Sequence, residues 1–143
     1  MGSSLDELAA RFTAATLPKD EWTHHAHLAV GMWHVHRYGP DEALTRLRTR
    51  IVRLNDSHGT PNSETRGYHE TITRAYVLLL SELMKASPQG TSAEDLAARL
   101  LRSALAQPDA LLTFYSRERL MSPAARAAWH EPDLNPLRWP EEK

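Results

Sequence analysis

Apolar residues recur at intervals of three and four along most of this chain, and no stretch alternates apolar with polar residues as a half-buried strand would. This spacing gathers apolar side chains on one face of an α-helix. The clearest helical segments are 23–38, 40–54 and 68–85, each bounded by a loop, a proline or a glycine. We therefore predict an all-α fold, a single-domain irregular bundle of six or seven helices.

The length of the chain fits one folding unit. A chain of 143 residues is long enough to bury a sizeable apolar core as a single domain, so we expect one helical domain over residues 1–143. Pro132, Pro136 and Pro140 interrupt the last segment. Residues 131–143 are therefore expected to form an extended C-terminal tail packed on the helices.

Charge and residue usage narrow the classes of function. The net charge is −1 at pH 7, so no basic excess points to a nucleic-acid partner. The chain has no cysteine, which excludes disulfides, thiolate nucleophiles and cysteine-ligated zinc. The longest aliphatic run, residues 77–80, is too short to cross a bilayer, and the N-terminal residues lack a signal-peptide pattern. We expect a cytoplasmic protein that acts on a small molecule, with no nucleic-acid or membrane partner. The oligomeric state stays open.

Five of the eight histidines lie within residues 22–38. On the predicted helix, His24 and His27 share a face with Leu28 and Val35, so both histidines should point inward. Neutral imidazole is the commonest metal ligand in proteins. Two imidazoles on the same side of a helix are therefore candidates to bind one metal ion.

A third ligand would have to come from another helix. His69 lies on the apolar face of the predicted helix 68–85, and we expect it in the first turn. Our hypothesis is that His24, His27 and His69 bind one transition-metal ion and leave coordination positions open for a substrate. Nitrogen and oxygen ligands suit iron, zinc, copper, nickel or manganese, and the sequence does not choose among these metals.

Glu70 directly follows His69. As a catalytic residue it would either complete the ligand set or act as a base on metal-bound water. The pair His69-Glu70 also begins like the zincin motif H-E-x-x-H. Thr73 occupies the position of the second histidine, so we do not predict a zincin protease.

Further residues are weaker candidates for a substrate pocket. They are His34, Tyr38, Arg66, Thr73 and Tyr76. Each also has an ordinary structural interpretation. The histidine, the threonine and the two tyrosines could be core residues, and the arginine could be a surface charge or a helix cap.

Three runs of the sequence resemble a family of small bacterial proteins that are usually labelled hypothetical. The resemblance covers nearly the whole chain, and its most specific part is the second run. It supports grouping the two helix histidines with the His-Glu pair and implies no reaction. The runs are Trp22-Thr23-His24-x-x-His27-Leu28, Gly67-Tyr68-His69-Glu70-Thr71-x-Thr73 and Ser122-Pro123-x-Ala125-Arg126.

These observations lead to one function hypothesis and two alternatives. The hypothesis is a small metal-dependent enzyme with a mononuclear site, of the oxygenase or the hydrolase and lyase type. The first alternative is a metal-free small-molecule-binding protein or lyase that uses the same histidine and glutamate pocket. The second alternative is a helical interaction module in which the histidines are structural.

Overall fold

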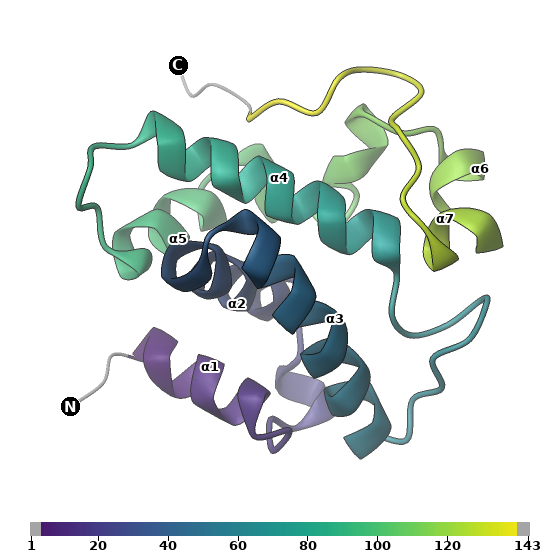
Figure 1. Cartoon of the computed structure of the whole chain (residues 1–143), viewed down its shortest axis with the longest axis horizontal. Helices are drawn as coiled ribbons and strands as arrows, with labels where there is room; N and C mark the ends of the chain where they lie inside the picture. Colours follow the sequence, from purple (N-terminus) through teal and green to yellow (C-terminus); the bar gives the residue numbers. More distant parts are fainter. Residues whose placement is uncertain (1–3, 140–143) are drawn as a thin grey trace.

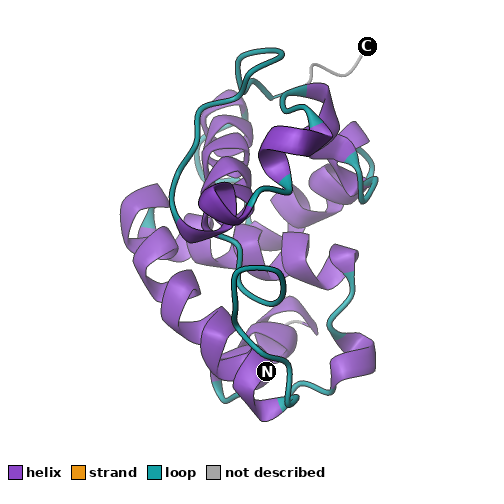
Figure 2. Cartoon of the chain, turned by 90° about the vertical axis from the view of Figure 1, so that its right-hand side faces the viewer, coloured by secondary structure: helices purple, strands orange, loops and turns teal. Residues whose placement is uncertain are grey.

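The computed structural model describes residues 4–139, and this part of the chain contains helices and loops but no strand (Figure 2). The predicted all-α, single-domain fold is confirmed. No helix within these residues is both long and apolar enough to cross a membrane. The α-helices are α1 Ser4–Thr13, α2 His24–Tyr38, α3 Pro40–Ser57, α4 Glu70–Ala86, α5 Ala93–Leu101, α6 Arg117–Leu120 and α7 Pro123–Ala127. Three short 3-10 segments join them, η1 Lys19–Glu21, η2 Ala104–Ala106 and η3 Ala110–Thr113.

Helix α2 is the central element of the bundle. It packs against α1, α3, α4 and α5, and in Figure 1 it lies between α4 and α1. Its buried apolar residues therefore occupy more than one face of the helix, as expected for an interior helix. They are Ala26, Leu28, Ala29, Val30, Met32 and Val35.

The ends of α2 follow the sequence signals. The hydroxyl of Thr23 accepts a hydrogen bond from the Ala26 backbone N–H, at 3.2 Å, and so caps the first turn. At the other end Gly39 has a φ of 80°, a backbone conformation that glycine adopts at little cost. Pro40 then begins α3. Because a single residue joins the two helices, α2 and α3 are held side by side.

Side chains cap the starts of α4 and α5. Helix α4 begins at Glu70 rather than near Tyr68, because the His69 side chain caps it. Helix α5 is capped by Ser92, whose hydroxyl accepts from the Asp95 N–H at 3.1 Å. The hydroxyl of the preceding Thr91 donates to the carbonyl of Pro88.

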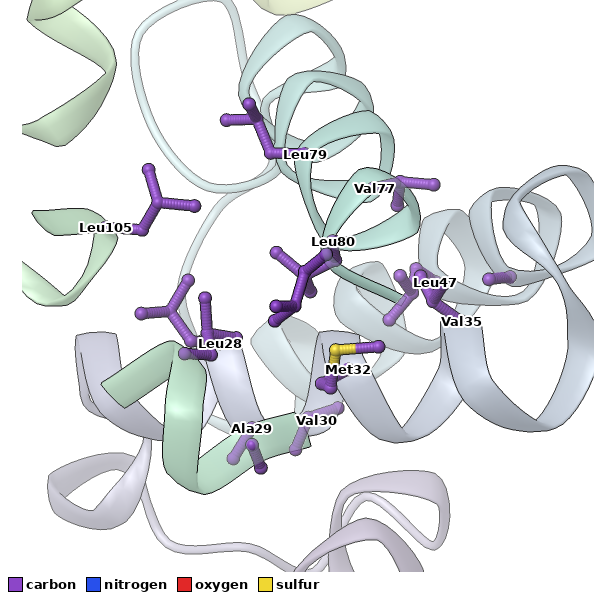
Figure 3. Close-up of a cluster of buried hydrophobic side chains, with 14 of the residues drawn as sticks. Leu28, Ala29, Val30, Met32, Val35, Leu47, Val77, Leu79, Leu80 and Leu105 are labelled. Carbon is purple, nitrogen blue, oxygen red and sulfur yellow. The ribbon is translucent and has the colours of Figure 1, made fainter. Parts of the chain in front are cut away.

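The main core lies between α2, α3 and α4. In Figure 3 the side chains of Leu28, Met32, Leu47 and Leu80 gather between the ribbons of these helices. Gly31 faces the same contact, and a Cβ atom there would lie 3.2 Å from the Cδ2 atom of Leu80. The absence of a side chain at Gly31 therefore lets α4 approach α2 closely.

The C-terminal third of the chain is less regular than the rest. The stretch from Pro108 to Tyr115 contains only the short segment η3, and the last helix ends at Ala127. Figure 1 shows α6 and α7 beside the N-terminal end of α4, with the following segment returning along α4. The backbone N–H of Trp139 donates to Glu82 Oε1 at 2.9 Å. Residues 131–139 thus lie against the bundle without helix, and residues 140–143 of the expected tail lie outside the described residues.

Candidate functional site

A cavity of about 510 Å³ lies between α2, α3, α4 and the segment 108–126. Its volume falls within the range of small-molecule sites, roughly 300–1,000 Å³. The wall is mostly apolar, with contributions such as Leu28, Ile51, Ile72 and Leu111. Its polar side chains are His24, His27, Asn55, Tyr68, His69, Thr73, Tyr76, Asp109, Arg117 and Arg126.

The structure divides the predicted site residues into two groups. The residues that line the cavity are His24, His27, His69, Thr73 and Tyr76. The residues that do not line it are His34, Tyr38, Arg66 and Glu70. The inward face predicted for the first two histidines is thus the cavity wall, whereas the catalytic role predicted for Glu70 has no support from its position.

His27 presents an imidazole to the cavity without a partner from the protein. Within residues 4–139 neither ring nitrogen makes a hydrogen bond, and the ring packs edge-on against Trp22 with centroids 3.8 Å apart. Burial among surrounding groups, together with the nearby His24, lowers the pKa of His27 to about 4. His27 is nevertheless an exposed residue by its accessible surface, and it lines the cavity. At neutral pH His27 therefore offers one N–H donor and one acceptor nitrogen to a ligand.

His24 and Tyr76 lie beside each other on the cavity wall, with ring centroids 5.9 Å apart. The Nε2 atom of His24 lies 3.0 Å from the carbonyl oxygen of Leu105. Because a carbonyl only accepts, Nε2 carries a proton and donates it, and Nδ1 has no hydrogen-bond partner within the described residues. Burial, with a contribution from Asp109, raises the pKa of Tyr76 to about 12, so its hydroxyl stays protonated. No hydrogen bond of this hydroxyl occurs within the described part of the chain.

His69 is occupied at both ring nitrogens. Its Nδ1 accepts from the backbone N–H of Ile72 at 3.1 Å, which makes His69 the N-cap of α4 rather than a residue of its first turn. Its Nε2–H donates to the carbonyl of Leu120 at 2.7 Å. Burial lowers the pKa of His69, so the neutral form persists. A metal ion would have to displace one of these two hydrogen bonds.

The predicted set of three metal ligands is therefore not assembled. Within residues 4–139 no group of three or more histidine, aspartate or glutamate side chains is placed to hold a metal ion. His24 and His27 each have a nitrogen without a protein partner, whereas His69 has none. Metal binding by the first two histidines stays a prediction.

Glu70 is held by Arg48, which lies outside the cavity, and by Tyr68 of the cavity wall. Arg48 Nε donates to both carboxylate oxygens, at 2.9 and 3.1 Å, and the hydroxyl of Tyr68 donates to Oε1 at 2.7 Å. The hydrogen bonds from Arg48 lower the pKa of Glu70, which makes the carboxylate a weak base. The contact ties the start of α4 to α3. These bonds favour a structural role over the predicted catalytic one.

His34 and Tyr38 belong to a different part of α2. His34 is fully buried; its Nδ1–H donates to the Val30 carbonyl at 2.8 Å, and its Nε2 accepts from Arg50 at 2.9 Å. Tyr38 lies under the guanidinium of Arg46, which is 4.2 Å from the ring centroid. Arg66 is exposed in the loop before α4. These contacts assign packing roles to the two inward residues.

Arg126 also lines the cavity, although its place in the Ser-Pro-x-Ala-Arg run gave no sign of a role there. Its Nη1 atom donates to the carbonyl of Gly67 at 2.7 Å, so α7 is tied to the loop that precedes α4. More than fifty residues separate these partners in the chain. Only the folded arrangement of α7 against α4 brings the arginine to the histidines, and no local spacing predicts this.

Comparisons with protein-family models, with curated proteins and with solved structures found no match to this chain. The chemistry of the cavity is therefore the basis for assigning a function.

The cap formed by His69 leads to a stability prediction. His69→Ala should lower the free energy of unfolding by about 1–3 kcal/mol, because it removes a helix cap and leaves the buried carbonyl of Leu120 without a donor. His69→Asn should lose less, because asparagine is among the best N-cap residues. Urea unfolding of the two variants measures the difference. Equal stability of both variants and the original protein would exclude the capping role.

His34 leads to a prediction on pH. Burial lowers the pKa of His34 from its ordinary value of 6.5 to about 4. Between pH 4 and 6.5, His34 is protonated in the unfolded chain and neutral in the folded chain. Its contribution to the free energy of unfolding is therefore fully present above pH 6.5 and is lost as the pH falls to 4. The loss from His34 should be about 3 kcal/mol. Urea unfolding across this range should show a shallower decline in His34→Gln, and an unchanged decline would contradict the assignment.

Proposed function

We propose that the protein binds a small organic molecule in the cavity between α2, α4 and the segment 108–126. The observation behind this proposal is a mostly apolar wall on which the His27 ring and the Tyr76 hydroxyl have no hydrogen-bond partner within the described residues. Polar groups in such surroundings are normally satisfied by protein, water or ligand. A ligand with an apolar body and a polar group matches both parts of the wall.

The protonation states of the wall define what these groups offer. His27 is neutral, with a pKa of about 4, and Tyr76 is protonated, with a pKa of about 12. The imidazole can accept a hydrogen bond and the phenol can donate one. A lyase would use the same two groups to take and return a proton, provided that its substrate places the reacting atom within hydrogen-bond reach of His27.

A second candidate is the metal-dependent enzyme with one transition-metal ion. It is favoured by one observation, namely that His24 lies close enough to His27 to lower its pKa. Each of these histidines has a nitrogen without a protein hydrogen bond, and iron, zinc, copper, nickel or manganese accepts such ligands. Water or substrate would have to fill the other coordination positions, which makes this candidate the weaker one.

Ligand binding is tested with three probes that share an eight-carbon chain, which are octan-1-ol, octanoate and octylammonium. We expect at least one of them to shift the NMR signals of cavity residues. Ile51 lines the cavity, so Ile51→Trp should fill part of it and weaken that probe about tenfold or more, the equivalent of 1.4 kcal/mol. Val52 follows on α3 and does not line the cavity, so Val52→Trp is the matched control. The proposal fails if none of the three probes binds, or if both tryptophan variants have the same effect.

Metal analysis tests the second candidate. Protein prepared without a histidine tag would be assayed for metal and then titrated with iron(II), zinc, copper(II), nickel and manganese. His24→Ala and His27→Ala should each abolish binding, while His130→Ala, which lies outside the cavity, should leave it intact. The candidate is discarded if no metal binds more tightly than the micromolar range, about −8 kcal/mol.

A further inference from the structure

Arg126 places a cation on the cavity wall without a carboxylate to balance it. Its Nη1 donates to the backbone carbonyls of Gly67 and Tyr68, at 2.7 and 3.4 Å, and both are neutral acceptors. Within residues 4–139 no carboxylate lies within ion-pair distance of this guanidinium. A guanidinium has five N–H donors, so Nε and Nη2 remain available. Burial lowers the pKa of Arg126, and no nearby acid opposes that effect.

The charges on the wall add up to an excess of positive charge. Arg117 and Arg126 supply two positive charges and Asp109 supplies one negative charge, which leaves a net charge of +1. The lowered pKa values of His27 and His69 keep both imidazoles neutral. The charge of Arg126 contributes to the lowered pKa of His69, whereas Asp109 raises the pKa of Tyr76. The positive charge and the carboxylate thus act on different parts of the wall.

A purely structural role would not require this arrangement. Fixing the loop before α4 uses the Nη1 atom alone. Arg126 is partly exposed, and the donors that these bonds leave free adjoin a mostly apolar cavity, where they are available to an anion. The planar fork of arginine also fits an oxyanion, with two donors for two oxygens.

We infer that the ligand of this cavity is an amphipathic organic anion, whose carboxylate or similar oxyanion head binds Arg126 and whose apolar body lies along the leucines and isoleucines of the wall. This inference rests on the proposed binding function. It adds the chemical class of the ligand and assigns Arg126 as the residue that selects it.

The three eight-carbon probes test the preference for an anion separately from the proposed binding of a small molecule in the cavity. Octanoate should bind the wild-type chain about tenfold or more tightly than octan-1-ol, the range of a charge-assisted hydrogen bond, and octylammonium should bind most weakly. Octanoate should also shift the NMR signal of the Arg126 Nε–H, which octan-1-ol should not. If octan-1-ol or octylammonium binds as tightly as octanoate, the inference is overturned while cavity binding stands. If none of the probes binds, the proposed function itself falls.

Variants then test Arg126 directly. Arg126→Gln should reduce the affinity for octanoate about tenfold or more, and it should lower the affinity for octan-1-ol much less. Arg66→Gln is the matched control, since Arg66 is exposed and lies outside the cavity. Thermal unfolding reports whether each variant folds. If Arg126→Gln does not fold, the inference is decided on the wild-type chain, by the order of its affinities for the three probes and by the shift of the Arg126 Nε–H signal. Unchanged octanoate binding in folded Arg126→Gln would overturn the assignment.

Discussion

The burial of α2 is the constraint on which the rest of the structure depends. Helices pack against this helix on several sides and bury its apolar residues together with His34. A buried polar group needs a hydrogen-bond partner. His34 has two, with a carbonyl on one nitrogen and Arg50 on the other. His27 is exposed and lies on the cavity wall. The histidines of this one helix therefore divide into packing residues and wall residues according to what lies opposite each of them.

The turn before α4 is the second organising feature, and it joins three parts of the chain. His69 caps α4 and donates to Leu120, Glu70 binds Arg48 of α3, and Arg126 of α7 binds the carbonyl of Gly67. Gly67 has a φ of 82°, and a Cβ atom there would lie 2.3 Å from a backbone oxygen, so only glycine fits. The run Gly-Tyr-His-Glu-Thr is thus explained largely by structure. Its histidine lines the cavity and its glutamate does not, and their hydrogen bonds leave them poorly suited to the metal and catalytic roles that the sequence favoured.

The sequence predicted the elements of the fold better than their contacts. Helical periodicity identified α2, α3 and α4, and it grouped His24 and His27, which both line the cavity, because a local repeat determines which side chains share a face. The role of His69 was not predictable in this way, since an imidazole can cap a helix or bind a ligand from nearly the same position. The contacts of the α3 arginines are a further case, since Arg48 reaches Glu70 and Arg50 reaches His34. Which arginine finds which partner depends on how α3 packs, and no spacing within the helix encodes it.

The cavity depends on residues that never touch it. Its outer wall is the segment 108–126, whose helices are too short to be stable without tertiary contacts. Polar contacts with the chain that follows hold this segment. Asp133 accepts from the backbone N–H and the hydroxyl of Ser116, at 2.8 and 2.6 Å, and the hydroxyl of Tyr115 donates to the carbonyl of His130 at 2.7 Å. Thr71 in the first turn of α4 donates to the carbonyl of Ala128 at 2.8 Å. The extended segment after α7 thus fixes the wall against α4, so the position of Arg126 beside the histidines follows from these hydrogen bonds as well as from α7 itself.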